Sequence, residues 1–154
     1  MRISHSLIVM FIGSFFVQYY LMSLLMTNNS KNITNSIGKL YLSIIMGLFM
    51  VLLELLMHDY HYSVFSKQSY FGYGIILVLF IYLYRNQVGV NDKQYLKEMI
   101  EHHSMALLTS DEILKKTDSY DITKLAKNIV QTQKDEISEM NKLLYKKNKN
   151  VRFS

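Results

Sequence analysis

Residues 7–26 read LIVMFIGSFFVQYYLMSLLM, an apolar run of twenty residues interrupted by one glutamine, Gln18. A helix of about 20 apolar residues spans the hydrocarbon core of a bilayer. A secretory signal peptide is the competing interpretation, because the run lies near the N-terminus behind Arg2. The run is long for such a peptide, however, and residues 27–29 (TNN) offer no small-residue cleavage site. The run therefore predicts a retained membrane helix.

Two further apolar runs follow, at residues 40–57 (LYLSIIMGLFMVLLELLM) and at residues 69–85 (SYFGYGIILVLFIYLYR). The last run has tyrosines at both ends, a residue type that favours the membrane–water interface. The sequence contains no proline, which fits uninterrupted helices. We therefore expect residues 1–85 to form a transmembrane region of three spans, with the two ends of the chain on opposite sides of the bilayer.

The segments between these runs are polar. Residues 27–39 are rich in Asn, Ser and Thr, and Gly38 is expected to act as a helix breaker there. Inside the second run, Glu54 is costly in lipid and is a functional-site hypothesis by default, although it lies near the helix end and can pair with His58. One helix face combines this carboxylate with soft and imidazole side chains, which suits either a metal pathway or ordinary packing: Met46, Met50, Glu54, Met57, His58 and His61.

Residues 86–154 are highly charged and carry twelve of the 17 basic and ten of the 12 acidic residues. The net charge of the chain is +5, and its densest basic part is the end of the sequence, with Lys142, Lys146, Lys147, Lys149 and Arg152. Such a run is typical of a solvated helix end, so we expect no nucleic-acid partner. The absence of cysteine excludes disulfides, zinc fingers, iron–sulfur clusters and thiol catalysis.

The charged segment has the pattern of two helices. Asn91 is a good N-cap, and apolar residues recur at steps of three and four from there to Lys116. Residues 117–121 form a turn in which Asp121 is expected to cap a second amphipathic helix. A short connection implies an antiparallel αα-hairpin, in which the numbers of facing residues sum to about 238.

This register predicts a cluster of soft and imidazole side chains between the two helices. In the run Met99-Ile100-Glu101-His102-His103-Ser104-Met105, Met99 precedes His103 by one helical turn. Across the hairpin lie Glu136 and Met140, with His102, Met105 and Gln133 at the edges. Thioether and imidazole ligands favour Cu(I) over Zn(II). In the alternative interpretation, His103, Gln133 and Glu136 form a hydrogen-bonded polar group and the methionines only fill the core.

Signatures of catalysis are missing from the sequence. It has no Ser/His/Asp order, no glycine-rich phosphate loop and no H-E-x-x-H motif. Met99 and His102 have the spacing at which a di-iron bundle has Glu-x-x-His, and a thioether in place of the carboxylate argues against dioxygen chemistry. We therefore expect a binding protein and not an enzyme.

The stretch from Asn91 to Leu144 resembles the domain-of-unknown-function 305 family. The shared pattern is Met-Ile-x-His-His-Ser at 99–104, Leu-Ala-x-x-Ile at 125–129 and Gln-x-x-Glu-Ile-x-x-Met at 133–140. The preceding spans are similar to the three-helix membrane region of one bacterial branch of that family, joined through the motif at 85–87 (RNQ). Glu101 stands where relatives usually have proline, so we expect a local helix kink to be lost.

The resemblance implies an all-α, ferritin-like fold in which residues 86–154 supply one hairpin, half of a four-helix bundle. A second copy would complete the bundle, so a homodimer is expected. The resemblance also implies copper binding, for sequestration or tolerance, through Met99, His102, His103, Glu136 and Met140. The alternative function is a metal-free membrane module whose hairpins pair between subunits through Ile129, Ile137 and Leu144.

Two features of the sequence bear on which side of the membrane holds the C-terminal domain, and they disagree. The first loop and the start of the charged segment hold more Lys and Arg than the N-terminus and the second loop, which places the C-terminal domain in the cytoplasm. The family resemblance implies an extracytoplasmic domain. We follow the resemblance and expect a multi-pass membrane protein with an extracytoplasmic C-terminal hairpin.

Overall fold

The computed structural model describes residues 3–62 and 67–150. Arg2 and Arg152, which entered the charge analysis, lie outside these ranges. The described residues form helices and contain no strand, so the predicted all-α class is confirmed. They divide into two compact units. Unit 1 holds the described residues up to Met22 together with Ile37–Gly89, and unit 2 holds Ser23–Ser36 together with the chain from Val90 onward.

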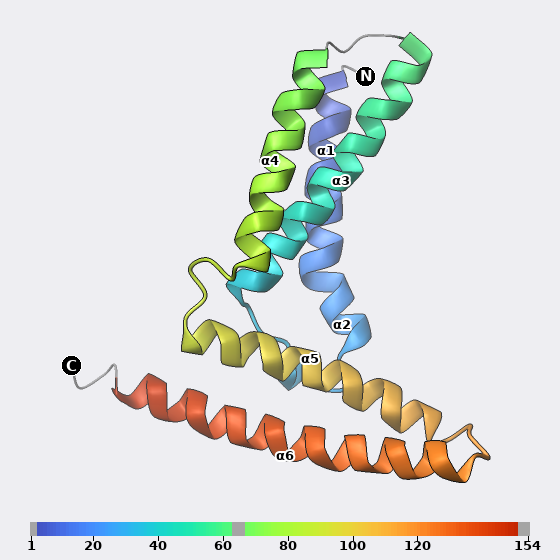
Figure 1. The fold of residues 1–154 in the computed structure, drawn as a ribbon, viewed down its shortest axis with the longest axis vertical. Coiled ribbons are helices and arrows are strands. Elements are labelled where there is room, and N and C mark those ends of the chain that lie inside the picture. The colour runs from blue at the N-terminus through green and yellow to red at the C-terminus, as the bar shows by residue number, and fades with distance from the viewer. Residues whose placement is uncertain (1–2, 63–66, 151–154) are drawn as a thin grey trace. The chain divides into compact units, whose positions relative to one another are not determined.

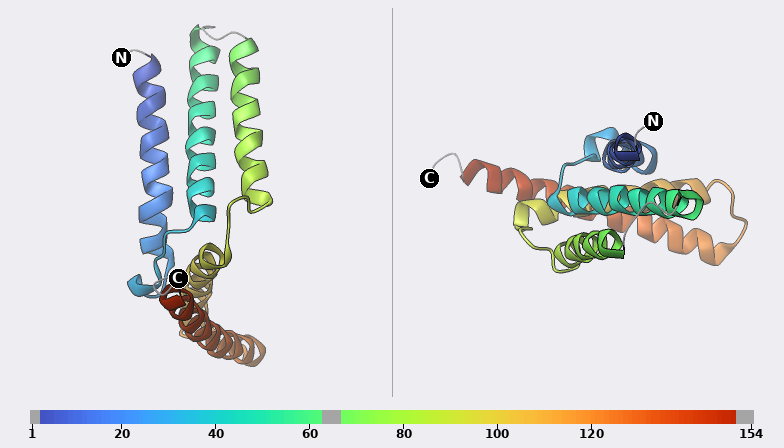
Figure 2. Two further views of the ribbon diagram at one scale, coloured as in Figure 1. Left: turned by 90° about the vertical axis from the view of Figure 1, so that its left-hand side faces the viewer. Right: turned by 90° about the horizontal axis from the view of Figure 1, so that it is seen from above.

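The helices of unit 1 correspond to the three apolar runs. The first run forms α1 (Ile3–Phe16), a π-helical turn η1 (Val17–Leu21) and α2 (Met22–Met26), whose first residue ends this unit. The second and third runs form α3 (Ile37–Tyr62) and α4 (Lys67–Arg85). Figures 1 and 2 show α1, α3 and α4 running side by side. Two stretches, His5–Met26 and Ile37–His61, are long and apolar enough to cross a membrane, whereas the apolar part of α4, Tyr70–Arg85, is shorter.

Helices α1 and α3 pack closely because α3 carries a glycine at the contact. A Cβ atom on Gly47 would lie 2.8 Å from the ring of Phe11. Small residues allow such close approach of helices in membranes. Along α1 and into η1, the rings of Phe11, Phe15 and Tyr19 stack in succession. Lys39 of α3 lies 5.0 Å from the centre of the Tyr19 ring.

The expected helix break at Gly38 is wrong. Helix α3 begins at Ile37, so Gly38 is its second residue. The N–H groups of the first turn of a helix have no intrahelical acceptor, so a glycine there disturbs no hydrogen-bond ladder. The polar loop therefore ends at Ser36, which is buried.

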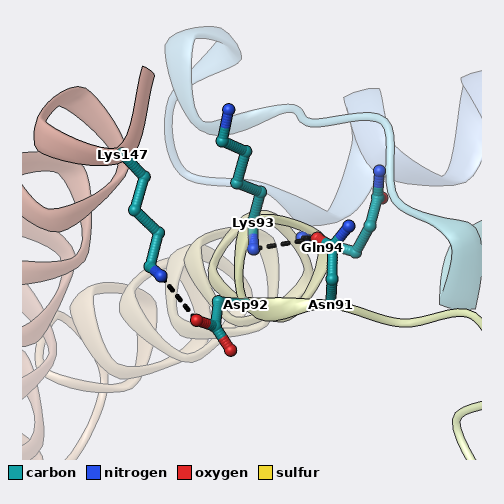
Figure 3. A network of polar contacts seen from close by, with 5 residues as sticks. All are labelled: Asn91, Asp92, Lys93, Gln94 and Lys147. Carbon is teal, nitrogen blue, oxygen red and sulfur yellow. Dashed lines mark hydrogen bonds and ion pairs between the residues drawn. The ribbon is translucent and has the colours of Figure 1, made fainter. Parts of the chain in front are cut away.

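Unit 2 is built on α5 (Asp92–Ile113) and α6 (Tyr120–Asn150), which Figure 1 shows lying side by side. Asn91 is confirmed as the N-cap of α5, since its side chain accepts hydrogen bonds from the backbone N–H groups of Lys93 and Gln94 (Figure 3). The expected cap of the second helix, Asp121, is wrong. Helix α6 begins one residue earlier, and the Ser119 hydroxyl accepts from the N–H of Ile122 at 3.4 Å.

Two contacts fix the register of α5 against α6. Lys147 Nζ lies 2.5 Å from Asp92 Oδ2 (Figure 3), and His103 Nδ1 lies 3.1 Å from Glu136 Oε2. The residue numbers of each pair sum to 239, as in an antiparallel pair with the expected register. Hydrogen bonding and the positive charge of Lys147 hold the pKa of Asp92 below its usual value.

The core of unit 2 lies between these helices. Ile100 and Leu107 of α5 pack with Ile137 of α6, and three half-buried side chains of α6 adjoin them: Val130, Met140 and Leu144. Ile137 and Leu144 belong to the surface that the metal-free alternative assigns to a second subunit. They are used inside one chain, so pairing between copies needs a different surface.

Candidate functional site

A buried carboxylate joins α5 to the segment 23–36 of the same unit. The Glu101 side chain is 5% exposed. Its Oε1 accepts a hydrogen bond from the Ser23 hydroxyl, and its Oε2 accepts from the backbone N–H of Thr34 at 2.9 Å and lies 3.4 Å from the Thr34 hydroxyl oxygen. A buried charge is tolerated when hydrogen bonds satisfy it. Glu101 thus tethers both ends of the loop.

Ser104 continues this attachment one turn along α5. It is 0% exposed, and its hydroxyl oxygen accepts from the backbone N–H of Asn28 at 3.1 Å and from Asn32 Nδ2 at 3.2 Å. The Thr34 hydroxyl also donates to the backbone oxygen of Lys97 at 2.6 Å. We call Glu101 and Ser104, with the residues of 23–36 that they hold, the loop clamp.

The sequence reasoning missed the loop clamp. It treated Glu101 only as a replacement for proline, and the uninterrupted course of α5 through this position agrees with that expectation. The available signal was the spacing of Glu101 and Ser104, which puts two acceptors on one helix face, together with a loop rich in Asn, Ser and Thr donors.

The predicted metal residues are brought together in part. His103 Nδ1, on a side chain 17% exposed, lies 3.1 Å from Glu136 Oε2, but without the alignment of a hydrogen bond. Met140 packs against the hydrophobic core formed by Ile100, Leu107 and Ile137. Met99 is half-buried, whereas His102 is exposed. The structure therefore pairs His103 with Glu136 and places Met140 against the core of unit 2.

The alternative interpretation, in which His103, Gln133 and Glu136 form a hydrogen-bonded polar group without a metal, is also incomplete. Gln133 Oε1 is buried and has no hydrogen-bond partner in the described part of the chain. A buried amide without a partner is costly, so the expected hydrogen-bonded group of His103, Gln133 and Glu136 does not account for this oxygen. Within residues 3–62 and 67–150, no three His, Asp or Glu side chains lie close enough to hold a metal ion. A metal site here therefore depends on thioether ligands.

Glu98 is a second carboxylate that the sequence reasoning did not single out. Its Oε2 is buried without a hydrogen-bond partner among the described residues. Burial raises the pKa of Glu98, the charge of His102 one turn away lowers it, and the charge of Glu101 raises it further. The net effect is a pKa above the usual value of a glutamate.

The polar residues of α3 form a separate cluster in unit 1. The Ser6 hydroxyl donates to Glu54 Oε1 at 2.5 Å, and His58 Nε2 lies 3.8 Å from the same oxygen. The expected pairing of Glu54 with His58 is thus present. A cavity of about 140 Å³ is lined by Glu54, Met57, His58 and His61.

Comparison with known proteins extends over both units. Residues 83–151 match the domain of unknown function DUF305. An uncharacterized protein from Acanthamoeba polyphaga mimivirus is 32% identical over 142 residues, which cover 92% of this chain and 93% of that protein. No solved structure matches. The similarity includes the apolar helices as well as the hairpin, and the chain belongs to the DUF305 family.

Proposed function

We propose that the chain is a multi-pass membrane protein whose α5–α6 pair binds Cu(I), for copper sequestration or tolerance. The observation that carries the metal proposal is the pairing of His103 with Glu136 across the two helices, together with the half-buried Met140, which packs against the core that joins the same helices. Membrane residence is supported by the two long apolar stretches and by the surface of unit 1.

The surface of unit 1 is suited to lipid. Water-facing proteins seldom expose large continuous apolar areas. All three helices carry large apolar side chains that are more than half exposed: Ile8, Val9 and Ile12 on α1, Leu53 and Leu56 on α3, and Phe71, Val78 and Tyr82 on α4.

The loop clamp supports an arrangement of three spans. Its hydrogen bonds hold residues 23–36 and α5 together, so both lie on the same side of a bilayer. Between them the chain passes through α3 and α4, which must therefore make an even number of crossings. Since α3 is long and apolar enough to cross, α4 has to return. Its 19 residues give a helix of about 28 Å, close to the thickness of the hydrocarbon core.

This topology is tested by single cysteines, which are clean probes because the chain has none of its own. In sealed vesicles, a membrane-impermeant maleimide is expected to label Lys31→Cys and Asp118→Cys from the same side and Gln68→Cys from the opposite side. All three positions are exposed. Labelling of all three from one side would contradict the arrangement.

The donor set fits a soft monovalent ion better than a hard divalent one. Met99 and Met140 supply thioethers, and His102 and His103 supply imidazoles, the ligand types that suit Cu(I). Because His103 Nδ1 lies 3.1 Å from Glu136 Oε2, Nε2 is the imidazole nitrogen left to bind the ion in this proposal. In this proposal Glu136 orients the imidazole and neutralises charge.

The copper proposal is tested on the full-length protein in detergent. Wild-type protein is expected to take Cu(I) from a colorimetric chelator, and Met99→Leu combined with His103→Ala is expected to remove the equivalent bound between α5 and α6, because it deletes one thioether and the half-buried imidazole. Met105→Leu, on the same helix, is the matched control and should retain the wild-type uptake. Unchanged uptake in the double variant, with its helical content intact, would refute the α5–α6 site.

A further inference from the structure

The five histidines of the chain fall into two groups. His102 and His103 lie on α5. His5, His58 and His61 lie on α1 and α3 of unit 1, where the contact of Ser6 with Glu54 brings the start of α1 against the last turns of α3. The second group has no part in the proposed α5–α6 site.

His58 of this second group is explained as a partner of Glu54, because a carboxylate in a spanning helix is costly without polar partners. Glu54 is satisfied by the Ser6 hydroxyl at 2.5 Å and lies 3.8 Å from His58 Nε2. Near the end of a helix, such partners reduce the cost of the charge. Met57 and His61, whose ring lies 5.3 Å from that of Tyr60, line the same cavity of about 140 Å³ as Glu54 and His58.

The cavity therefore combines one thioether, two imidazoles and one carboxylate within two turns of α3. Met57 and His61 are four residues apart, as are Glu54 and His58, so each pair shares a helix face. Among the described residues no three His, Asp or Glu side chains are grouped to hold a metal, so Glu54, His58 and His61 do not form a site by themselves and a site here needs Met57 as well. A soft ion that accepts a thioether and imidazoles is the better match.

We propose that this cavity is a second Cu(I) site, at the C-terminal end of α3, with Met57, His58 and His61 as donors and Glu54 supplying negative charge. The site shares with the proposed function only the class of ion. Since α3 begins directly after the loop of unit 2, a crossing by α3 puts this site on the side of the membrane opposite the α5–α6 site. The chain then has one copper site on each face of the bilayer.

The test starts from the full-length Met99→Leu/His103→Ala variant in lipid nanodiscs, so that the α5–α6 site is removed. Titration with Cu(I) against a chelator is expected to show one remaining bound equivalent, with sulfur and nitrogen neighbours in X-ray absorption. Adding Met57→Leu and His61→Ala is expected to weaken this binding by about tenfold or more. Adding Met46→Leu instead, a methionine of the same helix outside the cavity lining, is expected to leave it unchanged.

Two outcomes would overturn the second site: no copper bound by the starting variant, or bound copper that ignores both Met57→Leu and His61→Ala. Helical content measured on each variant separates loss of ligands from loss of fold. The two proposals fail separately. If Met57→Leu/His61→Ala alone removes all copper from otherwise wild-type protein, the α3 site stands and the α5–α6 site is refuted.

Discussion

Glu101→Ala is expected to release residues 23–36 from α5 and to lower the free energy of unfolding of unit 2 by about 3 kcal/mol or more. The substitution removes both acceptor oxygens of a side chain that is 5% exposed. The Ser23 hydroxyl and the Thr34 backbone N–H then lose their carboxylate acceptor, whereas the Thr34 hydroxyl keeps the Lys97 carbonyl. Each buried donor without an acceptor costs about 1–3 kcal/mol, and water entering the gap recovers part of this.

Hydrogen exchange of the full-length protein in detergent measures this effect at the amides of residues 23–36 and of α5. Glu101→Gln keeps one acceptor oxygen and nearly the same volume, so it is expected to show a smaller loss of protection. Glu139→Ala removes an exposed carboxylate of α6 and should leave exchange unchanged. Wild-type protection of Thr34 in the Glu101→Ala protein would show that the clamp does not hold the loop.

The loop clamp also stabilises the hairpin from within the same chain, where we had expected a second copy to do so. The family resemblance led us to expect a second copy of the hairpin to complete a four-helix bundle. Residues 23–36 of the same chain cover the part of α5 that carries Glu101 and Ser104. The segment 83–151 that matches the family therefore lacks this cover when it is considered alone.

Helix positions could be predicted because apolar periodicity and run length are local properties of the sequence. The runs 7–26, 40–57 and 69–85 each fall within helical segments, and the predicted α5–α6 register agrees with the contacts at Asp92 and His103. The errors at Gly38 and Asp121 both concern the first turn of a helix. In a first turn a glycine is tolerated, and two nearby polar residues can both serve as the N-cap. Local sequence patterns therefore determine the first residue of a helix only weakly.

The candidate site could be predicted only where the hairpin geometry determines it. The pairing of His103 with Glu136 follows from a short turn and a helical repeat. The loop clamp joins residues separated by 67 to 78 positions in the sequence, and the loop has no periodicity from which its direction could be inferred. The cavity at Glu54 likewise depends on how α1 meets α3, through Ser6.

Ile100→Ala is expected to lower the free energy of unfolding of unit 2 by about 2–5 kcal/mol, the usual cost of truncating a large aliphatic side chain in a packed core. Ile100 is 2% exposed and packs with Leu107 and Ile137. Its removal leaves a space between α5 and α6 that two helices held by a short connection cannot easily close. The cost should therefore fall in the upper part of this range.

Ile113→Ala is the matched control for this prediction, because it makes the same chemical change on the same helix at a residue that is 41% exposed. It is expected to cost less than about 1 kcal/mol. Denaturant titrations of the full-length protein, followed by hydrogen exchange of α5 and α6, compare the two variants. Equal losses would mean that the α5–α6 contact does not stabilise unit 2. A larger loss for Ile100→Ala would show that the core holds together the two helices that carry His103 and Glu136.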